Sequence, residues 1–122
     1  MVKYIGFYID EKLTTPLNTK NINGKDTPYL VFGNQDVSKK NTKWPFYLLN
    51  ESTGDIEDLE VTVQPIDNKR DVELIIENSK APKLPMMGVH RFTVSWRWGE
   101  NVKAGPLEAT LDVKGTIVDE LV

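Results

Sequence analysis

One alternating segment near the C-terminus decides the fold: Leu107-Glu108-Ala109-Thr110-Leu111-Asp112-Val113-Lys114-Gly115-Thr116-Ile117. Its apolar residues and its glycine share one parity, and its charged and hydroxyl residues share the other. Successive side chains of a strand point to opposite faces, so a strand would place the whole apolar set on one face. A helix would scatter the same residues around its circumference. The segment therefore predicts a half-buried β-strand.

The same alternation recurs upstream, most clearly where Phe92, Val94, Trp96 and Trp98 share a parity. Other segments are apolar on both parities or rich in aromatic and β-branched residues, which also favour strands. We predict about seven strands, at about 2–9, 28–33, 44–50, 58–64, 71–77, 89–98 and 107–118. The predicted core consists of the inward-facing apolar residues Phe46, Leu59, Val61, Leu74, Phe92, Val94, Trp96, Leu107, Leu111 and Val113.

Turn-forming clusters separate these segments, and two prolines predict a loop over 79–88. No stretch has the pattern of an amphipathic helix. Short strands at such spacing predict an all-β fold, a single antiparallel β-sandwich that occupies residues 1–122.

Composition excludes several function classes. The 122 residues suit one domain, and 15 basic against 18 acidic residues give a net charge of −3, which disfavours nucleic-acid binding. The absence of cysteine excludes a disulfide scaffold and a thiolate metal site. The N-terminus lacks the pattern of a signal peptide, and no apolar run approaches the ~18 residues of a membrane span. We therefore expect a protein made in the cytoplasm, without membrane insertion.

A polar segment rich in Thr, Asn and Lys occupies residues 10–27. At ~18 residues it is longer than most loops in compact domains. We expect it to form an arm that contacts partner subunits. We also expect the preceding strand, 2–9, to lie at a sheet edge, where strand addition could occur.

His90 and Ser95 are candidates for a nucleophile and its base, but they have opposite parity on one predicted strand. Their side chains would point to opposite faces, so they could not share a proton. We expect His90 to lie near the core and Ser95 to face solvent. With a single histidine in the chain, the sequence predicts that this protein is not an enzyme.

Four carboxylates cluster near a predicted turn, at Asp55, Glu57, Asp58 and Glu60. Converging carboxylates can hold Ca²⁺, but the spacing differs from that of an EF-hand loop. We expect a solvated acidic surface, with Asp58 and Glu60 on one face and Glu57 on the other. No metal ligand is assigned.

The three tryptophans, Trp44, Trp96 and Trp98, raise the question of a carbohydrate platform. Core packing is the favoured interpretation, because Phe92 and Val94 continue the same stripe. Arg91 and Arg97 have the opposite parity and predict a polar outer face rather than a phosphate-binding surface. The sequence therefore assigns no catalytic, cofactor-binding or metal residue, and we expect no cofactor.

Several short motifs carry a resemblance to a known family. They are a Phe-Gly pair in Leu30-Val31-Phe32-Gly33, a strand that ends in Asn50 before Gly54, Gly88 before Phe92-Thr93-Val94, and Gly105 before Pro106-Leu107. Over about residues 30–118 the chain resembles immunoglobulin-like and fibronectin-III-like sandwiches, most of all domains of the ASPM–SPD-2–Hydin type. The resemblance implies an immunoglobulin-like fold and a docking role, and it implies no catalytic residues.

Three functions remain open. The first is a non-enzymatic structural or assembly protein of the virion type, such as a phage head-decoration, tail or baseplate subunit. The second is a cytosolic protein-docking module, and the third is a carbohydrate-binding module. The first two predict protein subunits as partners, in a homo- or hetero-oligomer, and no nucleic acid.

Overall fold

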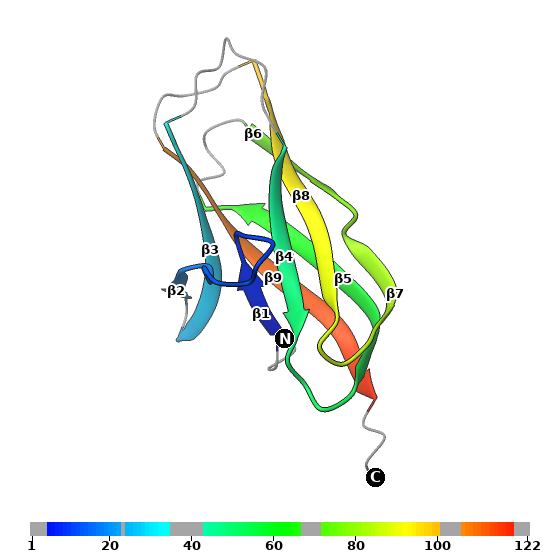
Figure 1. The fold of residues 1–122 in the computed structure, drawn as a ribbon. Helices are drawn as coiled ribbons and strands as arrows, with labels where there is room; N and C mark the ends of the chain where they lie inside the picture. The colour runs from blue at the N-terminus through cyan, green and yellow to red at the C-terminus, as the bar shows by residue number, and fades with distance from the viewer. Residues whose placement is uncertain (1–4, 23, 35–42, 67–71, 101–105, 119–122) are drawn as a thin grey trace.

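The structure, a computed structural model, describes residues 5–22, 24–34, 43–66, 72–100 and 106–118. All regular structure within these ranges is β-strand (Figure 1). Nine strands follow one another: β1 (Ile5–Tyr8), β2 (Thr19–Ile22), β3 (Lys25–Asn34), β4 (Trp44–Asn50), β5 (Asp55–Pro65), β6 (Val72–Glu77), β7 (Lys80–Leu84), β8 (Val89–Trp98) and β9 (Pro106–Val118).

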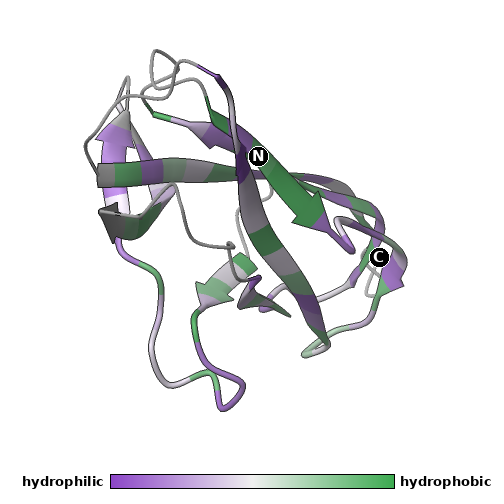
Figure 2. Cartoon of the chain, turned by 90° about the horizontal axis from the view of Figure 1, so that it is seen from above, coloured by the Kyte–Doolittle hydropathy of each residue, from purple (hydrophilic) through white to green (hydrophobic). Residues whose placement is uncertain are grey.

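The strands form two antiparallel sheets, which confirms the predicted all-β sandwich. The order in the four-stranded sheet is β1-β4-β8-β6, and the order in the five-stranded sheet is β2-β3-β9-β5-β7. The predicted edge position of the first strand is correct, because β1 pairs with β4 and ends its sheet. Figure 2 shows apolar and polar residues alternating as bands along the long strands, the pattern of a sheet with one buried face.

Two strands lie where the sequence predicted none. β2 lies inside the polar segment 10–27 and pairs back on the start of β3, and the Asn21 side chain accepts a hydrogen bond from Gly24 N in the turn. Gly24 has φ = 81°, a conformation that glycine adopts without steric cost. β7 lies inside the predicted loop 79–88. It tolerates Pro82 because it is an edge strand that pairs only with β5.

The core lies between the two sheets and follows the predicted parity. Nine of the ten predicted core residues are buried, and the tenth, Leu74 on the edge strand β6, is partly buried against them. Aromatic rings fill its centre: the ring centroids of Phe46 and Phe92 are 5.9 Å apart, and those of Phe32 and Trp96 are 5.0 Å apart.

A β-bulge at the start of β5 breaks the parity that the sequence implied. The register with β9 shifts between Glu57 and Glu60, and Asp58 has a φ of 54°. The extra residue allows Ile56 and Leu59, three apart, both to enter the core. Gly115 lies opposite the bulge, where an added Cβ would be 2.8 Å from Ile56 Cγ2. A larger residue at position 115 would therefore force the buried side chain of Ile56 to shift.

Candidate functional site

The first part of the polar segment folds on itself rather than projecting from the domain. Asp10 carboxylate oxygens accept hydrogen bonds from the backbone N–H groups of Thr14 and Thr15 and from the Thr14 hydroxyl. These contacts, the Thr14 hydroxyl first, lower the pKa of Asp10. Ile9 N donates to Thr15 O at 3.0 Å and closes the turn. Residues 10–15 therefore form a folded turn, and the expectation that the segment 10–27 contacts partner subunits stays a prediction.

The next three residues, 16–18, form a strap between the two sheets. Leu17 N donates to Phe7 O of β1 at 2.9 Å, and Tyr29 N of β3 donates to Asn18 O at 2.9 Å. Leu17 also packs its side chain against the core. The strap thus closes one part of the sandwich edge by tying β1 in one sheet to β3 in the other.

Beyond the strap, two strands keep edges without a strand partner among the described residues. β1 pairs with β4 only over residues 47–50, so residues 44–46 have β8 on one side and no strand on the other. β2 pairs with β3 only over residues 25–28, so from Leu30 onward β3 has β9 alone. The two half-open edges belong to different sheets and lie on the same side of the sandwich.

An apolar groove of about 620 Å³ lies between these edges. We call it the β3–β4 groove, and its main lining residues are Ile9, Leu17, Tyr29, Val31, Phe32 and Trp44. Phe32 and Trp44 meet edge to face, with ring centroids 4.8 Å apart. Ile9 and Val31 are 47% and 51% exposed, so large apolar side chains face solvent at the groove. A groove of this size and lining can hold apolar side chains of a ligand.

The two edges beside the groove differ chemically. Pro45 on β4 has no backbone N–H, so β4 offers one hydrogen-bond donor fewer for pairing with another strand. Lys43, which directly precedes β4, is the charged residue of the lining, and its Nζ lies 2.8 Å from Glu77 Oε1. The open part of the β3 edge, residues 30–34, carries neither a proline nor a charge, so β3 is the edge better suited to contact a partner.

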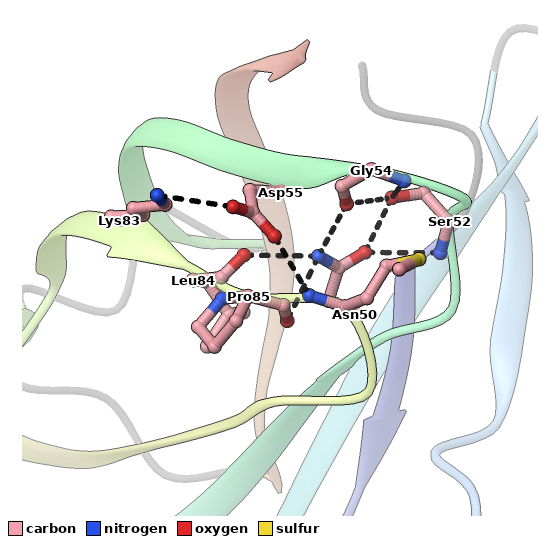
Figure 3. A network of polar contacts seen from close by, with 8 residues as sticks. Asn50, Ser52, Gly54, Asp55, Lys83, Leu84 and Pro85 are labelled. Atoms are coloured by element: carbon pink, nitrogen blue, oxygen red, sulfur yellow. Dashed lines mark hydrogen bonds and ion pairs between the residues drawn. The ribbon is translucent and has the colours of Figure 1, made fainter. Parts of the chain in front are cut away.

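A buried asparagine organises the opposite end of the sandwich (Figure 3). Asn50, at the end of β4, is 0% exposed, and its Nδ2 donates to the carbonyl oxygens of Gly54, Leu84 and Pro85 at 3.0–3.1 Å. Its Oδ1 accepts from the backbone N and the hydroxyl of Ser52. One side chain thus joins the β4–β5 turn to the β7–β8 turn, and its polar groups are satisfied despite full burial.

The β7–β8 turn that Asn50 holds exposes a set of apolar side chains. We call residues 85–89 the tip, in which Met86, Met87 and Val89 are 53%, 69% and 45% exposed. Gly88 N donates to Pro85 O at 2.8 Å, and Met86 N donates to Asp55 Oδ1 at 3.2 Å. The tip is therefore a fixed turn with an apolar surface.

The residues that suggested a hydrolase lie on opposite faces of β8. His90 faces inward, and its Nε2 donates to Asn78 O at 2.6 Å. Ser95 has the opposite parity and faces out, as predicted, but it is only 8% exposed, so the expectation that it faces solvent is wrong. It is a small side chain on a central strand, which lies between β4 and β6, and Ile75 of β6 is its register partner.

The four clustered carboxylates do not converge. Asp55 pairs with Lys83 at 3.1 Å, and the hydrogen bond from Lys83 is the first cause of its lowered pKa. Glu60 lies 3.7 Å from Lys80. The expected opposition of Glu57 to Asp58 is wrong, because the bulge leaves both exposed. Within the described ranges, no group of three or more His, Asp or Glu residues is placed to hold a metal ion.

The aromatic stripe packs into the core. Trp96 is 2% exposed, and Trp44 and Trp98 are partly buried against it. Of the three, Trp44 alone lines the groove. Arg91 and Arg97 are exposed on the outer face of β8, and Arg97 lies 3.8 Å from Glu73.

Comparison with protein-family models, with curated proteins and with solved structures finds no match. In the part of the chain that the structure describes, no helix has the length and apolar character needed to cross a membrane. Sequence reasoning missed the groove and the tip. Pro45 inside an apolar strand was a signal of an open edge, and adjacent Met86 and Met87 in a predicted loop were a signal of an exposed apolar turn.

Proposed function

We propose that this protein is a non-enzymatic assembly subunit that binds other protein subunits, its own copies included, through the β3–β4 groove. The observation that carries the proposal is the pair of half-open strand edges that flank one apolar groove. Open edges offer backbone donors and acceptors, and apolar surface at the groove gains free energy when a partner covers it. Protein chains supply both kinds of contact.

We infer further that the sandwich is of the immunoglobulin-like type. The order β1-β4-β8-β6 supports this, because it corresponds to the order A-B-E-D of an immunoglobulin sheet, and β9 lies beside β5 as strand F lies beside strand C. One departure bears on function. In an immunoglobulin domain the last strand, G, lies beside strand F. Here β3, which precedes β4 in the chain, takes that place beside β9. Residues 29–34 of β3 pair with β9, and the first part of β3 does not.

The structure favours assembly over carbohydrate binding. A sugar platform needs aromatic faces open to solvent together with polar groups, whereas Trp96 is buried and the groove lining is mostly apolar. The narrower alternatives of a virion subunit and a cytosolic docking module both agree with a protein-binding groove. The virion setting stays a prediction, and the identity of the adjacent genes would test it.

The test compares two aspartate substitutions at exposed apolar positions, Val31→Asp in the groove and Ile66→Asp outside it. Sedimentation velocity over a concentration series should show association of the wild type and of Ile66→Asp, while Val31→Asp stays monomeric. Association of Val31→Asp at wild-type strength, or a wild type that is monomeric throughout, would contradict the proposal.

A second measurement separates the carbohydrate alternative. Trp44 lines the groove, so its fluorescence should respond to protein concentration, and Trp44→Phe should remove that part of the response. A spectral shift caused by a soluble glycan and lost in Trp44→Phe would favour the carbohydrate-binding module instead.

A further inference from the structure

We propose that the occupant of the β3–β4 groove is the tip of a second copy of this chain, so that the subunits join head to tail. The inference rests on the proposed function, since it names the partner of that same groove. It is carried by the presence, on one molecule, of an apolar groove and of an exposed apolar turn at a different place.

The tip has two features that are energetically unfavourable in an isolated monomer, an exposed apolar surface and a strained backbone. Met87 has a φ of 61°, in the left-handed region that disfavours residues with a Cβ, and it is 69% exposed. A glycine there would relieve the backbone and remove the exposed apolar surface. Contact with a partner would remove the apolar side chain of Met87 from water, and this gain accounts for a large residue at the position.

The tip is also held in one conformation before it meets a partner. Its backbone is bonded to Asn50 on both sides: Met87 N donates to Asn50 O at 2.9 Å, and Asn50 N donates to Gly88 O at 3.0 Å. Because the turn is already fixed, docking requires ordering of the methionine side chains but not of the backbone. Preorganisation of this kind favours affinity.

The chemistry of the two surfaces is compatible. The tip, residues 85–89, contains no charged side chain, and the charge of Lys43 in the groove lining is countered by Glu77. Docking therefore buries no unpaired charge, which would be unfavourable. Methionine is unbranched and adapts to irregular apolar cavities, and the partly buried ring of Trp44 in the lining offers a favourable contact to its sulfur.

The positions of the two surfaces determine the kind of assembly. The tip is bonded to Asn50 at one end of β4, whereas the groove is lined by residues 44–46 at the other end. These ends are six residues apart, or about 20 Å along a strand. In Figure 1 the β7–β8 turn lies at the lower end of the sandwich, and β4 starts at the upper end. Each contact thus leaves one tip and one groove free, which builds a ring or an open chain of subunits.

Mixing two full-length variants tests the inference. Met87→Asp spoils the tip and keeps the groove, and Val31→Asp spoils the groove and keeps the tip. Each alone should bind its own copies more weakly by roughly 30-fold or more, as expected for a central interface residue. An equimolar mixture should form dimers and nothing larger, because only one intact tip and one intact groove remain per pair. Native mass spectrometry distinguishes these species.

A fold-safe variant and a matched control complete the experiment. Met87→Gly suits the positive φ, so it should keep or raise the melting temperature while losing assembly, and Ile66→Asp should assemble as the wild type does. If Val31→Asp loses assembly but both Met87 variants keep it, the groove function stands and the tip is not its occupant. A mixture that forms no dimer, or that forms larger species, would also overturn the head-to-tail contact.

Discussion

The backbone N–H of Met87 donates to the carbonyl oxygen of Asn50 at 2.9 Å, which joins the exposed turn between β7 and β8 to the last residue of β4. The first residues of the same strand, 44–46, line the β3–β4 groove. One strand therefore supports both of the apolar surfaces to which we assign assembly. Asn50 is central to this arrangement, since its side chain and its backbone both bind the turn.

Replacement of Asn50 by alanine should lower the free energy of unfolding by about 2–4 kcal/mol, because it leaves buried carbonyl groups of two turns without donors. Urea denaturation measures this loss. Asn21→Ala is the control, since it removes a single exposed hydrogen bond to Gly24 N and should change stability little. Equal effects of the two substitutions would contradict the role assigned to Asn50.

The core prediction concerns Leu111, which lies at the centre of β9 and is 1% exposed. Leu111→Ala should cost ~2–5 kcal/mol of stability, through lost burial and the cavity left behind. Val118→Ala on the same strand is the control, because Val118 is 38% exposed. A loss below that of the control would mean that β9 does not present this face to the core.

Stability should depend on pH through Asp55. Lys83 and the backbone N–H of Met86 hold the pKa of Asp55 below its ordinary value of 3.8. A carboxylate with a lowered folded-state pKa adds stability above its unfolded-state value and loses it as the pH falls toward the folded-state value. The melting temperature of the wild type should therefore fall more steeply below about pH 4 than that of Asp55→Asn. Glu57→Gln, at an exposed carboxylate, should keep the wild-type slope.

Deletion of residues 12–25 should abolish assembly and leave a folded sandwich. The deletion removes the strap, which lines the groove through Leu17, and the edge strand β2. Among the deleted residues whose burial the structure describes, none is a fully buried core residue. Stability should fall, since Leu17 packs against the core. Circular dichroism and sedimentation velocity measure the two effects, with Lys12→Ala as an unaffected control. Undiminished assembly of the shortened protein would show that this segment is only a loop.

The protein should not hydrolyse esters or peptides. His90 is buried against Asn78 O, and Ser95 lies on the other face of β8, so neither can activate the other. His90→Ala should change the melting temperature but no hydrolysis rate. A hydrolysis rate measured on the purified protein that disappears in His90→Ala would contradict the assignment of a non-enzymatic role.

The sequence predicted most of the fold because parity is a local property. Alternate residues of a strand face the same side, and this is why the evenly spaced residues of β9 are buried together: Leu107, Leu111 and Val113. The same reasoning failed at Glu57 and Asp58, where one extra residue in the bulge leaves both side chains exposed. It also missed β2 and β7, because short edge strands depend on the strands that they pair with more than on their own pattern.

By itself, the sequence determined the all-β class, the core face of the long strands, and the separation of His90 from Ser95. Each of these follows from the two-residue period of a strand. Tertiary structure alone decided that β1 and β2 each pair with only part of β4 and β3, and that the β7–β8 turn is bonded to Asn50. Such features depend on the register and length of strands that are distant in the chain, and register is set by packing between segments rather than within them.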